Sequence, residues 1–249
     1  MQFLFIIFWK IRVLLFYFFI ALISITVLPI ISFTKYLNIS YGSQYKLAKL
    51  YSELFLFGLK FFCGIHIEVF GLEKIPKPPF VILPNHQSFA DNFIMPVIFP
   101  FKQSWIMKKE LLSYPLLGPG LKVLKPIAID RTQSFSVRQI ISQGSEKIKQ
   151  GLCVVIYPEA TRVSPYKNIK FKPSGIKLAQ EAQVPVVMVA HNAGLCWPKG
   201  FWVKKSGTIK IVISEPISKE ECINTPVREL NDKVEKWITD KKNELINIT

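Results

Sequence analysis

A histidine and an aspartate stand five positions apart in residues 85–91, NHQSFAD, which follow an apolar run. Five residues of a regular helix turn through about 500°, so His86 and Asp91 would share no helical face. In a strand–turn–helix segment, however, the chain can fold Asp91 back onto the His86 ring. A carboxylate on one ring nitrogen fixes the tautomer and leaves the other nitrogen free to accept a proton. The pair could therefore serve as a general base for a hydroxyl nucleophile.

The same segment also has a purely structural interpretation. Ser88 and Asp91 have the spacing of a helix capping box, with Asp91 at the third helical position. In that case His86 is an ordinary residue of the turn and has no chemical role. The spacing alone leaves both interpretations open.

A second charged segment, Glu159 to Arg162, follows another apolar run. The two residues could form a surface ion pair, which contributes little when exposed. Alternatively, Arg162 could present its planar donors to a phosphate while Glu159 holds it in place. A third apolar run ends in Asp130 and Arg131, which could also be a surface pair. Further positive charge after Arg162 comes from Lys167, Lys170 and Lys172.

The composition limits the class of protein and its partners. Half of the 249 residues are hydrophobic and 20% are charged, which excludes intrinsic disorder and a protein built only of membrane spans. The net charge of +15 favours anionic partners, such as nucleic acid, an anionic membrane or phosphorylated substrates. The basic residues form no long tract, which argues against nucleic acid. The four scattered cysteines predict neither a zinc site nor a disulfide framework, and they fit a reducing compartment.

The N-terminal region is expected to attach the chain to a membrane. Residues 13–33 carry no charge and, at about 1.5 Å per residue, could cross a hydrocarbon core of about 30 Å. A signal peptide is the alternative, but the run is long and no clean cleavage site follows it. Because Pro29 could end or kink the helix, we expect either a single membrane helix or a helical hairpin. Residues 45–62 follow as an amphipathic helix that packs on the domain or lies on the bilayer.

The rest of the chain alternates β-branched runs with helical segments. This order predicts an α/β domain with a mixed, largely parallel sheet flanked by helices. We divide the chain into an anchoring segment, residues 1–63, and a catalytic α/β domain, residues 64–249. Such sheets place their sites at the carboxyl ends of the strands. Strands are expected at 65–69, 80–83, 104–107, 126–129, 153–157, 186–190 and 209–213, and helices at 92–98, 135–150, 174–182 and 226–245.

In their order and spacing, these segments resemble the glycerolipid acyltransferase family. Residues 85–91 match its N-H-x4-D block, and residues 157–162 resemble its F-P-E-G-T-R block. The resemblance runs from about residue 65 to residue 216; its second block is similar to residues 109–111, Gly118 and residues 129–131, and its fourth to residues 184–192. Ala160 stands where the third block has Gly. A turn with negative φ would tolerate Ala160, whereas a left-handed turn would put the phosphate site in doubt.

The resemblance implies direct acyl transfer without a metal or another cofactor. His86, oriented by Asp91, would deprotonate the sn-2 hydroxyl of 1-acyl-sn-glycerol-3-phosphate, and the oxygen would attack an acyl thioester. The product would be phosphatidic acid for phospholipid synthesis, and the donor would be acyl-CoA or acyl carrier protein. By the same resemblance, the glycerol-3-phosphate moiety would be held by Arg131, Glu159, Thr161 and Arg162.

The expected partners are these two substrates and a phospholipid membrane, with acyl carrier protein as one candidate donor and no nucleic acid. The catalytic domain would face the cytoplasm, at the inner membrane if the cell is bacterial. Two alternatives remain open: an acyltransferase acting on another lysolipid, and a basic, membrane-anchored binding protein without catalysis. His191 has no carboxylate close by in the sequence, so we expect it to be structural.

Overall fold

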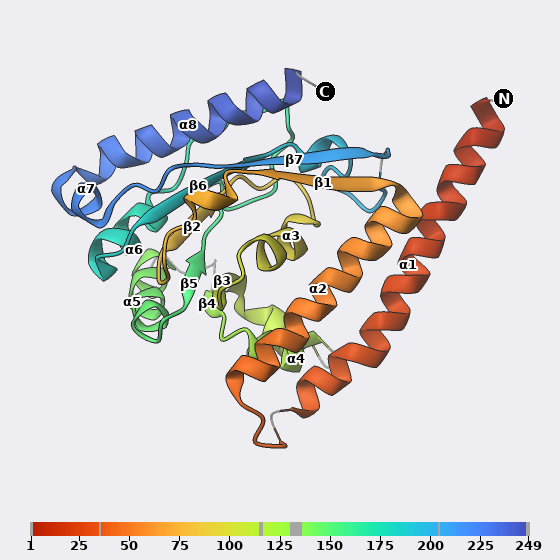
Figure 1. The fold of residues 1–249 in the computed structure, drawn as a ribbon, viewed down its shortest axis with the longest axis horizontal. Helices are drawn as coiled ribbons and strands as arrows, with labels where there is room; N and C mark the ends of the chain where they lie inside the picture. Colours follow the sequence, from red (N-terminus) through yellow and green to blue (C-terminus); the bar gives the residue numbers. More distant parts are fainter. Residues whose placement is uncertain (1, 35, 115–116, 130–135, 204, 248–249) are drawn as a thin grey trace.

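A central β-sheet carries the loops that bear the charged residues (Figure 1). The computed structural model describes residues 2–34, 36–114, 117–129, 136–203 and 205–247. Within them, seven strands form one sheet in the order β1-β7-β6-β2-β5-β3-β4. Only β6 and β7 pair antiparallel, so the predicted mixed, largely parallel sheet is confirmed. The strands are β1 (Ile65–Phe70), β2 (Val81–Pro84), β3 (Gln103–Lys108), β4 (Ile127–Ile129), β5 (Cys153–Val155), β6 (Val186–His191) and β7 (Gly207–Ile213).

Helices cover both faces of this sheet. They are α1 (Gln2–Phe33), α2 (Tyr41–Cys63), α3 (Asp91–Ile98), α4 (Leu117–Val123), α5 (Ser136–Lys149), α6 (Ser174–Ala182), α7 (Lys219–Asn224) and α8 (Val227–Asn247). The expected strands and helices of the α/β region are present with ends shifted by at most two residues, as far as the described residues reach. The short helices α4 and α7 were not expected.

Alternation along β2 shows how the layers are held together. Ile82 packs into a core shared with α1, α2 and α3, whereas Val81 and Leu83 pack into a second core with α5, α6 and α8. Side chains of successive strand residues point to opposite faces, so a strand buried on both faces reads as a continuous apolar run. The polar groups that follow such a strand lie at the edge of the sheet.

The N-terminal helix α1 is a single helix that contains Pro29 without ending there. The described residues of this region therefore form one helix and no hairpin. The next helix, α2, runs back alongside α1 and packs against it (Figure 1). A Cβ on Gly58 of α2 would lie 2.6 Å from the Phe19 ring, so this close approach of the helices requires glycine.

Most of the surface of α1 faces outward. By length and composition, Ile6–Phe33 could cross a membrane, and 22% of its most apolar window is buried inside the molecule. The opposite side of α1 belongs to the protein core, because Val13 and Phe16 are fully buried in one cluster with residues of β1 and β7. The division at residue 64 stays a prediction, and the two segments share this core.

A matched pair of phenylalanines on α1 tests how much this packing stabilises the fold. Phe16 is 0% exposed, with ring-centroid distances of 5.5 Å to Phe55 and 5.9 Å to Trp197, whereas Phe18 is 70% exposed. Phe16→Ala should lower the free energy of unfolding by about 3–5 kcal/mol. Phe18→Ala should change it by less than about 0.5 kcal/mol. Chemical denaturation in detergent micelles measures both, and equal losses would contradict this packing.

Candidate active site

The loop between β2 and α3 brings His86 and Asp91 together. The Nδ1 atom of His86 lies 3.0 Å from Oδ2 of Asp91. The same oxygen accepts the backbone N–H groups of Gln87, at 2.9 Å, and Ser88, at 2.8 Å. The carboxylate thus closes the loop on itself and fixes the ring, as the general-base interpretation predicts.

The loop also contains the hydrogen bonds of a capping box, in addition to the contact between His86 and Asp91. Asp91 is the first residue of α3 rather than the third, and the N-cap residue Ala90 makes no side-chain capping bond. The Ser88 hydroxyl accepts the N–H of Ala90 at 3.2 Å, and the Asp91 carboxylate accepts the N–H of Ser88 at 2.8 Å, which is the reciprocal bond of a capping box. Asp91 therefore caps the chain at the start of α3 and also contacts the His86 ring, so the two interpretations are compatible.

Asp91 is completely buried. Its carboxyl is therefore ionised only if neighbouring groups stabilise the charge. Burial acts to raise the pKa of its carboxyl, but the two neighbouring histidines and the N–H of Ser88 outweigh this, and the pKa lies below its usual value. An ionised Asp91 accepts a hydrogen bond from the N–H group at Nδ1 of His86. The Nε2 atom of His86 then keeps its lone pair for a substrate proton.

The third motif holds His86 from the other side. Oε2 of Glu159 accepts the backbone N–H of His86 at 2.5 Å, and the N–H of Val163 donates to the His86 carbonyl at 2.8 Å. The Tyr157 ring stacks on the imidazole at a centroid distance of 3.9 Å and an interplanar angle of 16°. The two sequence motifs therefore form one rigid unit around the proposed base.

Glu159 is buried, with 7% of its surface exposed. Burial, together with the Asp91 charge, raises the pKa of its carboxyl to about 8, although the His86 N–H and the Lys242 charge act against this. Its observed partner is the His86 backbone. The predicted contact of Glu159 with the acceptor substrate stays a prediction.

Ala160 adopts the left-handed conformation, with φ at 57°. The turn at this position therefore needs a positive φ, which the glycine of the family motif would adopt without strain. Its N–H still closes the turn onto the Tyr157 carbonyl at 3.0 Å. Of the next two residues, Thr161 is exposed and Arg162 is half-buried, and both line a cavity with His86; their contact with a substrate stays a prediction. Arg131 lies outside the described residues.

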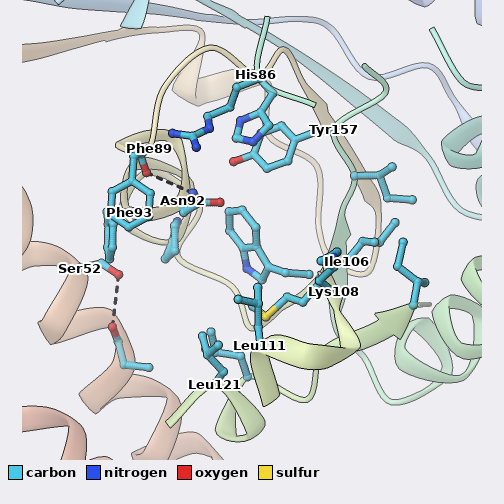
Figure 2. Close-up of a pocket in the computed structure, with 18 of the residues that line it drawn as sticks. Ser52, His86, Phe89, Asn92, Phe93, Ile106, Lys108, Leu111, Leu121 and Tyr157 are labelled. Carbon is cyan, nitrogen blue, oxygen red and sulfur yellow. Dashed lines mark hydrogen bonds between the residues drawn. The ribbon is translucent and has the colours of Figure 1, made fainter. Parts of the chain in front are cut away.

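This cavity has a volume of about 980 Å³ and extends from His86 into the space between the N-terminal helices and the sheet. In the view of Figure 2, His86 and Tyr157 lie at one end, and Leu111 and Leu121 lie at the other. The polar end contains the Arg162 motif, whereas the remaining walls are mostly apolar. Cavity residues that the sequence motifs did not indicate include Ile20, Leu28, Tyr51, Phe55, Trp105 and Lys199.

His191 lies on the buried side of the pair. Its Nε2 atom is 2.8 Å from the Asn85 carbonyl oxygen and 3.7 Å from Oδ1 of Asp91. The Asn85 side chain in turn bonds both peptide groups of His191, at 2.8 and 2.9 Å. Burial lowers the pKa of His191, although the Asp91 charge and the Asn85 carbonyl act against this, and its hydrogen bonds tie the end of β2 to the end of β6. This arrangement agrees with the structural role expected for His191.

Metal-ligating clusters are absent from the described part of the chain: no group of three or more His, Cys, Asp or Glu side chains there could hold an ion. The four cysteines are free and buried.

Comparison with known proteins shows which family the chain belongs to. Residues 66–192 match the family described as Acyltransferase. The chain belongs to this acyltransferase family. A Pseudomonas aeruginosa protein named 1-acyl-sn-glycerol-3-phosphate acyltransferase is 42% identical over 184 residues, which cover 73% of this chain and 71% of the relative. A Saccharomyces cerevisiae protein of the same name is 28% identical over 209 residues, covering 82% and 69%.

The fold of this acyltransferase also has a solved counterpart. The crystal structure of the 1-acyl-sn-glycerophosphate acyltransferase PlsC from Thermotoga maritima matches with a TM-score of 0.77 and 26% identity. The match covers 95% of this chain and 97% of the other. It therefore includes the N-terminal helices as well as the α/β domain.

Replacing the proposed base tests the site of this acyltransferase. His86→Ala should lower turnover by about 10²–10⁴-fold, and Asp91→Asn should be similarly severe because the charge that stabilises the imidazolium is lost. His66, exposed on the edge strand β1, supplies the control. Steady-state thiol release should be unchanged in His66→Ala. Near-normal turnover of folded His86→Ala protein would refute the assignment.

The strained turn at Ala160 predicts a stabilising substitution. A left-handed Ala costs about 1–2 kcal/mol, and the extra chain entropy of Gly offsets about 0.4–1 kcal/mol of the gain. Ala160→Gly should therefore raise the free energy of unfolding by up to about 1 kcal/mol while activity is kept. The same change at Ala179, inside α6, should lower it. Thermal unfolding of both variants measures these changes. A loss of stability in both variants would contradict the inferred strain at Ala160.

Proposed function

We propose that this acyltransferase moves a fatty acyl group from an acyl thioester to the sn-2 hydroxyl of 1-acyl-sn-glycerol-3-phosphate. The product is phosphatidic acid. The observation that carries this proposal is a base, His86, that opens into the same cavity as Arg162 and a long apolar compartment. The names of the relatives from Pseudomonas aeruginosa and Saccharomyces cerevisiae support the choice of acceptor.

The arrangement of His86 and Asp91 supports acid–base catalysis by one histidine, which first accepts a proton and then returns it. Nε2 of His86 takes the hydroxyl proton as the acceptor oxygen bonds to the thioester carbonyl carbon. The carbon–sulfur bond then breaks, and the thiolate leaves with the proton from the imidazolium. An alcohol and a thioester become an ester and a thiol, so the balanced reaction needs no metal, redox cofactor or covalent enzyme intermediate.

The charged end of the cavity fits a phosphate monoester. Such a group carries a charge of about −1.5 to −2 near neutral pH. Arg162 can offer two parallel donors, and Lys172 and Lys199 also line the cavity. Thr161 can add a hydroxyl donor from the same turn. We assign the glycerol-3-phosphate moiety to this end, together with Glu159 and Arg131 as predicted contacts.

The apolar part of the cavity fits an acyl chain. Its lining includes Ile20, Leu28 and Ile31 of α1 and Leu121 and Leu124 of the α4 region. Each methylene that leaves water for such a site contributes about 0.8 kcal/mol. The thioester carrier, coenzyme A or acyl carrier protein, need only present its carbonyl near His86.

We further propose that the enzyme works at a phospholipid membrane with its catalytic domain on the cytoplasmic side. The apolar outer surface of α1 supports the attachment. The free, buried cysteines agree with a reducing compartment. Both the acceptor and the product partition into bilayers, so an attached enzyme meets its acceptor by lateral diffusion.

Substitution of Arg162 tests the assignment of the phosphate. Arg162→Lys keeps the charge but loses the planar pair of donors. It should raise KM for lysophosphatidate by about tenfold or more, because one charge-assisted hydrogen bond to the phosphate is lost. KM for acyl-CoA should stay nearly unchanged. Arg228→Lys, on the exposed surface of α8, is the matched control.

The readout is a panel of lysolipid acceptors with a fixed acyl-CoA, analysed by lipid mass spectrometry. Lysophosphatidate should be preferred over lysolipids that lack a phosphate monoester. A larger change in KM for acyl-CoA would move Arg162 to the donor site. Equal rates for a zwitterionic lysolipid would overturn the proposed acceptor, and absence of thiol release would overturn the reaction.

A further inference from the structure

The loop between β6 and β7 exposes two large aromatic side chains. Phe201 is 62% exposed and Trp202 is 47% exposed, whereas Val203 beside them is buried. The reaction derived above uses neither aromatic ring. Exposed neighbouring aromatic residues on one loop indicate a contact surface.

The loop is fixed against the first half of α1. The Phe201 ring stacks on Tyr17 with a centroid distance of 4.5 Å and an interplanar angle of 16°. The Tyr17 hydroxyl donates to the Phe201 carbonyl, and the Trp9 indole N–H donates to the Val203 carbonyl at 3.2 Å. In Figure 1 this loop, in cyan-blue before β7, lies beside α1. Phe201 and Trp202 are therefore presented from a rigid base.

The outward surface of the same half of α1 is apolar. Ile11, Leu14 and Phe18 are 49%, 54% and 70% exposed, and they belong to the stretch that could cross a membrane. Two exposed lysines, Lys199 and Lys205, flank the aromatic pair on the loop. Aromatic rings beside basic side chains are the combination found at the headgroup level of bilayers, where lysines meet lipid phosphates.

We propose that the loop of residues 198–203 is a second membrane contact, with Phe201 and Trp202 inserted among the headgroups of an anionic phospholipid bilayer. The proposal rests on the proposed function only in taking a bilayer as the surface. Lys199 and Lys205 lie at the level of the lipid phosphates. Lys199 also lines the catalytic cavity. Contact of this loop with the membrane therefore places the part of the cavity wall formed by Lys199 at the depth of the lipid headgroups.

A single fluorophore can report the depth of the loop, because the native cysteines are all buried. An environment-sensitive dye is attached to the Trp202→Cys variant of the full chain, reconstituted into vesicles of phosphatidylcholine and phosphatidylglycerol. The control is the Asp232→Cys variant, whose dye sits on the exposed surface of α8, a helix on the opposite face of the sheet from α1. A lipid with a quencher on its acyl chain near the headgroup, and aqueous iodide, are added separately. Should Trp202→Cys not fold, the dye is placed at Lys205→Cys on the same loop.

The dye at position 202 should emit at shorter wavelength than the dye at position 232. The lipid-borne quencher should quench it at least twice as strongly, and iodide should quench it less. Equal iodide quenching at both positions would overturn the proposal. A shift to shorter wavelength without lipid quenching would also overturn it, because a protein would then cover the loop. Acyl transfer is measured separately in detergent micelles, so failure of the proposed function leaves the depth measurement intact.

Discussion

Three hydrogen-bond donors converge on one buried carboxylate oxygen, Oδ2 of Asp91, and the geometry of the site follows from this convergence. A buried charge is costly unless it is fully partnered. The donors are the His86 ring and two successive backbone N–H groups, so partnering Oδ2 forces the loop after β2 into one conformation. The other oxygen, Oδ1, has no hydrogen-bond partner among the described residues. That conformation points the second ring nitrogen of His86 away from Asp91. Catalytic geometry and satisfaction of a buried charge are here the same requirement.

The surrounding strands reinforce this arrangement because their carboxyl ends meet at one edge of the sheet. Glu159 after β5 holds the His86 N–H, and Asn85 after β2 exchanges hydrogen bonds with His191 at the end of β6. Each of these groups is polar and buried, and each finds its partner on a neighbouring strand. The side chains that hold the site therefore also lock the order of the strands β6-β2-β5.

The sequence predicted the strands well because β-branched runs buried on both faces have few alternatives. It also predicted the pairing of His86 with Asp91 and the place of Arg162, since these residues occur in short motifs that directly follow strands. The partner of Glu159 was not predictable, because its contact with the His86 backbone spans 73 positions and leaves no local pattern. The sequence left both signs of φ open at Ala160, and the structure has the left-handed one, which Ala disfavours. The same is true of Lys199 and of the apolar walls from α1, which reach the cavity only through tertiary packing.

The cavity is bounded by helices whose other residues build the protein core, and this gives the acyl chain a mechanical role. A chain in the cavity occupies space that packed side chains fill elsewhere, so it acts as a removable piece of the hydrophobic core. By mass action, whatever binds only the folded state stabilises it, by about 2.7 kcal/mol at a ligand concentration one hundred times Kd. An acyl chain bound there as proposed would therefore stabilise the folded enzyme, including the packing of α1 on the sheet domain. The supply of substrate would then also affect how long the enzyme stays folded, because the same cavity holds the substrate and forms part of the core.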